Sequence, residues 1–101
     1  MSVNVLIEGD PDIFVSISGQ ATFENKWVPI AEKIGLVFVP EFASGIPVTP
    51  ATCGTVIAEL KQLEVEFNRD KATQVFRHDL RILIAILEEH VLRGGRDAYV
   101  G

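Results

Sequence analysis

Four polar residues break the apolar faces of the two long helices that the second half of the chain predicts. Cys53 and Glu64 lie within the apolar arc of the first helix, and Asp79 and His90 lie within that of the second. Polar residues that interrupt a local pattern in this way are either functional or satisfied by structural partners. These four positions are therefore the first places to look for chemistry.

Cys53 and His90 could form a nucleophile and base pair. If the two helices form an antiparallel hairpin that turns near residue 70, residues whose numbers sum to about 140 lie at one level. Cys53 and His90 would then meet at the open end of the hairpin, where an imidazole could activate a thiol. The structural alternative is stronger, because a lone cysteine is usually a small buried hydrophobe and a histidine near a helix C-terminus is stabilised by the helix dipole.

Glu64 and Asp79 would lie about two levels apart in the same hairpin. Two close carboxylates can raise the pKa of one of them into a range useful for acid–base catalysis. The same alignment, however, predicts three pairs of opposite charges across the seam: Glu59 with Arg81, Lys61 with Asp79, and Glu64 with Arg77. Residues that flank a packed helical seam commonly pair in this way, so we expect Glu64 and Asp79 to be interhelical ion-pair partners.

A further charged group, Glu8, Asp10 and Asp12, surrounds a turn near the start of the chain. Its simplest interpretation is a solvated turn, because Asp and Pro are common turn residues. Asp-x-Asp supplies too few oxygen ligands for a calcium loop, and we predict neither a metal nor a cofactor. The remaining interpretation is an acidic recognition patch, whose negative field would speed the docking of a basic partner.

The first half of the chain predicts the elements that would position this turn. Residues 3–7 and 13–17 each alternate with period two on either side of a Gly/Asp/Pro turn, which indicates a β-hairpin. Residues 26–34 are expected to form a short helix. Residues 36–39 are apolar on both faces, as in a strand covered on both sides, and residues 40–49 are expected to be a loop.

The second half predicts two long helices, over about residues 50–67 and 72–92, which Gly94 and Gly95 bring to an end. The order ββαβ followed by a helical hairpin indicates a single α+β domain over residues 1–101. In this fold a small sheet of about three strands, the N-terminal hairpin plus one strand, packs against a short helix and the C-terminal antiparallel helical hairpin.

Composition excludes several classes of protein. The chain has 101 residues, of which 48% are apolar, and 9 basic against 14 acidic side chains give a net charge of −5. A chain of this length can bury about two-thirds of its surface, so it can form a core without disulfide or metal cross-links. Its single cysteine excludes an intrachain disulfide and a cysteine-cluster zinc site. The acidic balance disfavours direct binding to nucleic acid, which needs a dense set of cations.

The sequence predicts a cytoplasmic protein that does not cross a membrane. The longest apolar run, residues 82–87, is far shorter than the roughly 20 residues of a membrane span. The first residues also lack the basic and apolar segments of a signal peptide.

The charge is unevenly distributed, with a balance of −4 over residues 1–50 and −1 over residues 51–101. We find no phosphate-binding, metal-ligating or catalytic motif. In its size, its acidity and its lack of such motifs the chain resembles bacterial immunity proteins and antitoxins that neutralise nuclease toxins. That resemblance implies a binding protein that occludes the working surface of a more basic partner, such as a toxin domain. The acidic turn with Glu8, Asp10 and Asp12 supplies the candidate contacts.

Two other classes stay open. One is a homodimeric adaptor or regulatory module, because the broad apolar face of the second long helix and an outward Val65 leave apolar surface that a second copy could cover. The other is a small enzyme that uses Cys53 with His90, or Glu64 with Asp79. Since no catalytic motif is found, we do not predict an enzyme.

Overall fold

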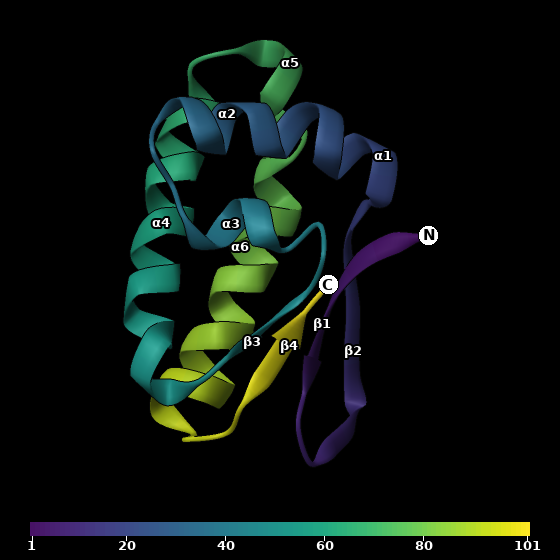
Figure 1. The fold of residues 1–101 in the computed structure, drawn as a ribbon, viewed down its shortest axis with the longest axis vertical. Helices are drawn as coiled ribbons and strands as arrows, with labels where there is room; N and C mark the ends of the chain where they lie inside the picture. Colours follow the sequence, from purple (N-terminus) through teal and green to yellow (C-terminus); the bar gives the residue numbers. More distant parts are fainter.

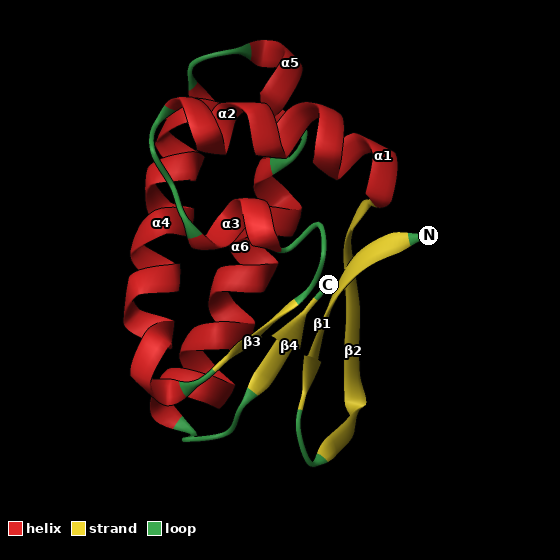
Figure 2. Cartoon of the chain, in the orientation of Figure 1, coloured by secondary structure: helices red, strands yellow, loops and turns green.

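A four-stranded antiparallel sheet lies beside a layer of helices in the computed structural model, which describes residues 1–101 (Figure 1). The strands are β1 (Ser2–Ile7), β2 (Asp10–Gly19), β3 (Ile46–Val48) and β4 (Ala98–Val100), in the spatial order β2-β1-β4-β3. Figure 2 shows the helices gathered on one side of these strands. The predicted α+β class is confirmed, with four strands in place of about three.

The predicted N-terminal hairpin is present as β1 and β2. Leu6 lies opposite Phe14 in its register, and Gly9 adopts a positive φ of 82° in the turn, a conformation that glycine alone reaches without strain. β1 buries every second side chain beneath the helices: Val3, Val5 and Ile7. The alternate side chains of β1 therefore point away from the helical layer.

The helical segment after β2 begins earlier than predicted. It comprises α1 (Gln20–Thr22), the π-helical turn η1 (Phe23–Trp27) and α2 (Val28–Lys33), in place of one helix from residue 26. Phe23, Trp27 and Ala31 are wholly buried. Their spacing of four residues extends the apolar face towards the N-terminus, which explains the earlier start.

The predicted third strand at residues 36–39 is wrong. The chain forms the one-turn helix α3 (Phe38–Glu41) there, while β3 lies within the predicted loop. The helix is set by Glu59 of α4 (Pro50–Asn68), whose carboxylate accepts hydrogen bonds from three successive backbone N–H groups at 2.9–3.2 Å: those of Val37, Phe38 and Val39. Local periodicity cannot reveal a partner that lies twenty residues further along the chain.

The predicted helical hairpin is confirmed. Its first arm is α4, and its second arm comprises α5 (Lys71–Gln74), α6 (Arg77–Ile86) and the π-helical η2 (Leu87–Arg93). Thr49 and Thr52 form a capping box at the start of α4. None of the helices combines the length and the apolar character needed to cross a membrane.

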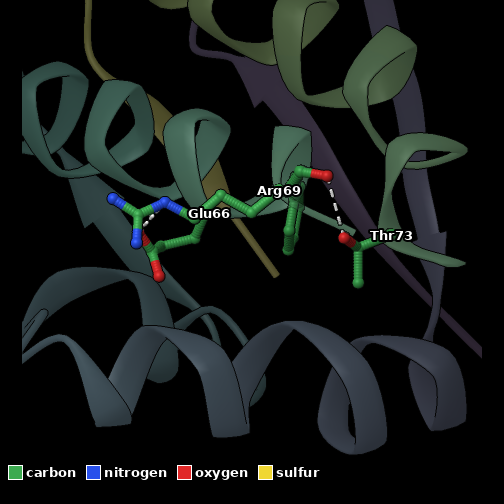
Figure 3. Close-up of polar contacts among 4 residues, drawn as sticks. Glu66, Arg69 and Thr73 are labelled. Carbon is green, nitrogen blue, oxygen red and sulfur yellow. Dashed lines mark hydrogen bonds and ion pairs between the residues drawn. The ribbon is translucent and has the colours of Figure 1, made fainter. Parts of the chain in front are cut away.

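The turn between the two arms is fixed by side chains that bind its backbone. The buried Thr73 hydroxyl donates to the Phe67 carbonyl at 2.9 Å and to the Asp70 carbonyl at 3.0 Å. Figure 3 shows Thr73 reaching back across the turn, with Glu66 and Arg69 paired at 3.4 Å beside it. The first of these bonds satisfies a carbonyl group that the end of α4 leaves without a helical partner, and the second ties Thr73 to the N-cap residue of α5.

The core is a single cluster of 24 buried residues between the sheet and the helices. Trp27 is wholly buried, with its ring centroid 5.3 Å from that of Phe23, 5.2 Å from that of Phe67 and 6.0 Å from that of Phe76. Such aromatic pairs add to the stabilisation gained from burial alone.

Candidate functional site

Cys53 and His90 do not form a hydrogen-bonded pair. Cys53 is fully buried, and its Sγ donates to the Leu87 carbonyl oxygen at 3.5 Å. Burial raises the pKa of this thiol, and the negative charge of Glu88 raises it further. Because the thiolate is the nucleophilic form, this environment holds the thiol in its unreactive state and gives Cys53 a packing role.

Glu64 and Asp79 are held by different features. Arg81 Nε donates to Glu64 Oε2 at 2.5 Å, so the predicted pairing of Glu64 with Arg77 is wrong. Asp79 forms no ion pair with Lys61; it lies in the first turn of α6, where the helix dipole favours a carboxylate. The intervening helix α5 lengthens the connection, which displaces the partner of Glu64 by about one helical turn.

Glu59 is the buried polar residue whose role the sequence did not reveal. Only 8% of its surface is exposed, and it binds the start of α3 instead of the predicted Arg81. Its carboxylate compensates the free N–H groups and the positive end of the short helix. This arrangement fixes α3 against α4. Both carboxylate oxygens of Glu59 accept backbone N–H groups, so neither is left for a catalytic role.

The acidic turn is divided by the structure into neutralised and free carboxylates. Asp10 is half-buried and lies 3.5 Å from Arg96, and it also accepts a hydrogen bond from the Asp12 backbone at 3.2 Å. Glu8 and Asp12 are exposed. Asp97, which sequence analysis did not associate with this turn, joins them because the Glu8 N–H donates to its carbonyl at 2.9 Å.

A row of apolar side chains crosses the face of the sheet that the helices leave open. Leu6 lies opposite Phe14 on one side and Tyr99 on the other, and Tyr99 lies opposite Pro47. Each of the four strands therefore contributes one residue. Phe14 is 60% exposed and Tyr99 46% exposed, so this row faces solvent. The sequence contained an indication of this row. Leu6 and Phe14 are apolar although they alternate with the core residues of the hairpin and so belong to its outer face.

Two glycines make room for the Tyr99 ring. A Cβ atom at Gly45 would overlap Tyr99 Oη, and one at Gly101 would lie 3.0 Å from Tyr99 Cε1. Gly45 also has a positive φ of 92°. The ring therefore lies directly against the backbone of Gly45, just before β3, and of Gly101, and this close packing restricts its orientation.

A shallow depression of about 380 Å³ lies along this row. Its apolar floor includes Leu6, Pro47 and Tyr99, and Glu8 and Asp97 stand at its acidic end. Glu8 and Asp97 also line a second depression, beside Arg96. Neither depression is lined by the polar residues of the helical seam, and no three His, Cys, Asp or Glu side chains are grouped as a metal site.

No protein-family model, curated protein or solved structure matches this chain. The class that the fold defines is an α+β protein whose sheet is covered by helices on one face only. Functional inference therefore rests on the open face and its charges.

Proposed function

We propose that this is a small acidic cytoplasmic binding protein that inhibits or neutralises a more basic protein partner, as an immunity protein or antitoxin does. The observation that supports it is the apolar row on the open sheet face, which ends at free carboxylates. Contiguous exposed apolar surface marks interaction sites. Protein interfaces combine an apolar centre with a polar rim, which is the arrangement found here.

The charge of the surface favours a basic partner over a second copy of the chain. The protein has a net charge of −5, and the open face ends at the exposed Glu8, Asp12 and Asp97. A basic surface gains from this field, whereas two acidic copies repel each other. Of the apolar surface behind the homodimeric alternative, Leu83 and Leu87 are wholly buried in the core, while Val65 is 53% exposed and leaves a smaller apolar area for a second copy.

A selection with genomic fragments tests the proposal. Fragments of the genome from which the chain comes are expressed in a host that carries or lacks the chain, and those that stop growth only in its absence are recovered. We expect at least one to encode a basic protein that binds the chain with an association rate that falls as salt rises. Recovery of no such fragment, or binding that is independent of salt, contradicts the proposal.

Matched variants assign the effect to the open face. Phe14→Ser combined with Tyr99→Ser removes two exposed aromatic side chains of the row, and we expect it to abolish rescue. Val65→Ser combined with Val75→Ser removes comparably exposed apolar groups from the helical side and should leave rescue intact. Circular dichroism checks that both variants fold. Equal rescue by the two variants would place the partner elsewhere.

A further inference from the structure

The depression on the open face has an apolar floor and an acidic end. Leu6, Pro47 and Tyr99 form the floor, and they come from three neighbouring strands. Neighbouring strands lie about 4.8 Å apart, so a floor made by three strands spans about two such spacings. A ligand that fits it combines an apolar stem with a cationic end.

Glu8 follows the last residue of β1 and Asp97 precedes the first residue of β4, so the two lie opposite each other. The hydrogen bond from the Glu8 N–H to the Asp97 carbonyl fixes this register, which continues the pairing of Leu6 with Tyr99. Neither carboxylate forms an ion pair within the chain; the nearby Arg96 pairs with Asp10 instead. Like charges directly opposite each other are unfavourable in a sheet, and a cation placed between them removes that repulsion.

Tyr99 supplies the third part of the arrangement. Its ring is restricted by Gly45 and Gly101, and it borders the same depression as the two carboxylates. A phenol ring attracts a cation above its face, and a planar guanidinium stacks on it while still donating to carboxylates. An ammonium group is more strongly hydrated and lacks this planar fork.

We infer that this depression receives an arginine side chain of the basic partner, an inference that rests on the proposed function. The aliphatic stem lies over Pro47, the guanidinium stacks against the neighbouring Tyr99 ring, and its N–H groups donate to Glu8 and Asp97. Charge complementarity selects this occupant, because the free groups at the end of the depression are all carboxylates. The surrounding row of Phe14 and Leu6 then packs against apolar residues beside that arginine.

The test is an NMR titration of the full chain labelled with ¹⁵N. The probes are N-acetyl-arginine methylamide and N-acetyl-lysine methylamide, which present the two side chains without a second charge. We expect the arginine probe to shift the amide signals of Glu8, Asp97 and Tyr99 in a saturable manner. The lysine probe should bind at least about fivefold more weakly, because it cannot stack and donate at the same time.

Two double variants with the same change in net charge control this experiment. Glu8→Gln with Asp97→Asn removes the carboxylates of the depression and should weaken arginine binding about tenfold. Glu32→Gln with Glu89→Gln removes two exposed carboxylates elsewhere and should leave binding unchanged. Equal effects of the two variants, equal affinity for the two probes, or shifts spread over all acidic residues would each overturn the arginine site.

Failure of this inference is distinguishable from failure of the proposed function. If rescue in the genomic selection depends on Phe14 and Tyr99 but the arginine probe does not bind, the face docks a basic partner without an arginine in the depression. If the arginine probe binds as expected but the selection recovers no fragment whose toxicity the chain prevents, the arginine site is supported and the neutralising role is contradicted.

Discussion

The two faces of the sheet present the same alternating strands to different surroundings. On the inner face Val5 and Val100 are wholly buried beneath the helices. On the outer face Leu6 is half-buried, while Phe14 is 60% exposed and Tyr99 46% exposed. Because the core fills without the outer row, folding does not require apolar residues there. If the outer row serves binding, as we propose, variants on the two faces should separate stability from function.

The largest contrast is expected between Trp27 and Phe14. Trp27→Ala removes the largest fully buried side chain of the core and should lower the free energy of unfolding by about 3–5 kcal/mol. Phe14→Ala removes a side chain that is 60% exposed and should cost less than about 1 kcal/mol. Urea unfolding monitored by circular dichroism measures both. Similar losses would show that the outer row is part of the stabilising core.

Glu59 should come next, as the polar support of the helical layer. Glu59→Ala leaves three backbone N–H groups at the start of α3 without their acceptor, and we expect a loss of about 2–3 kcal/mol in unfolding free energy. Hydrogen exchange should quicken at the amides of Val37, Phe38 and Val39. Glu32→Ala, at an exposed helical site, serves as control. Unchanged exchange at these three amides would contradict the capping role.

A smaller effect is expected in the reactivity of Cys53 on the covered side. Since burial and Glu88 raise the pKa of the thiol above its ordinary 9.0, less thiolate is present in the folded chain than in the unfolded chain at a given pH. Alkylation by iodoacetamide at pH 8 should be at least about tenfold slower in the folded protein than in urea. The rate for the folded protein should also begin to rise at a higher pH than the rate for the unfolded protein. A folded thiol that reacts as fast as the unfolded one would revive the nucleophile hypothesis.

The smallest effect is expected on the open face, where a substitution should raise the stability of the protein instead of lowering it. Glu8→Gln removes a carboxylate that opposes Asp97, so we expect it to stabilise the isolated protein by about 0.2–1 kcal/mol. Glu32→Gln removes the same charge from an exposed helical site and should change stability by less. Thermal unfolding at low salt compares the two variants. Destabilisation by Glu8→Gln would mean that the carboxylate stabilises the folded protein, and would contradict its being free to bind a cation.

Sequence predicted the elements that carry their own periodicity. The alternation at residues 3–7 and 13–17 and the long apolar arcs of the second half each repeat often enough to identify the hairpin and the helices. β3 and β4 have three residues each, which is too short for a period, and they exist because they pair with each other and with β1. α3 depends similarly on a carboxylate from another helix.

The same reasoning explains what sequence could find of the candidate site. Glu8 and Asp12 were identifiable because they flank a local turn. Asp97 and Tyr99 were not, because only the pairing of β4 with β1 brings them to that turn. Charged residues that are far apart in the sequence and become neighbours only in the fold cannot be associated from local sequence patterns. Leu6 was accessible as an apolar residue on the outer phase of its strand.

The position of β4 also bears on how the protein is made. β4 lies between β1 and β3, so the sheet joins residues 2–7 to residues 98–100 through its centre. A nascent chain can form the β1–β2 hairpin early, but that hairpin has no central neighbour until residue 100 has left the ribosome. Folding must therefore wait for nearly the whole length of this sequence, with β1 exposing an unpaired edge in the meantime. A chaperone that protects this edge during translation should raise the yield of folded protein.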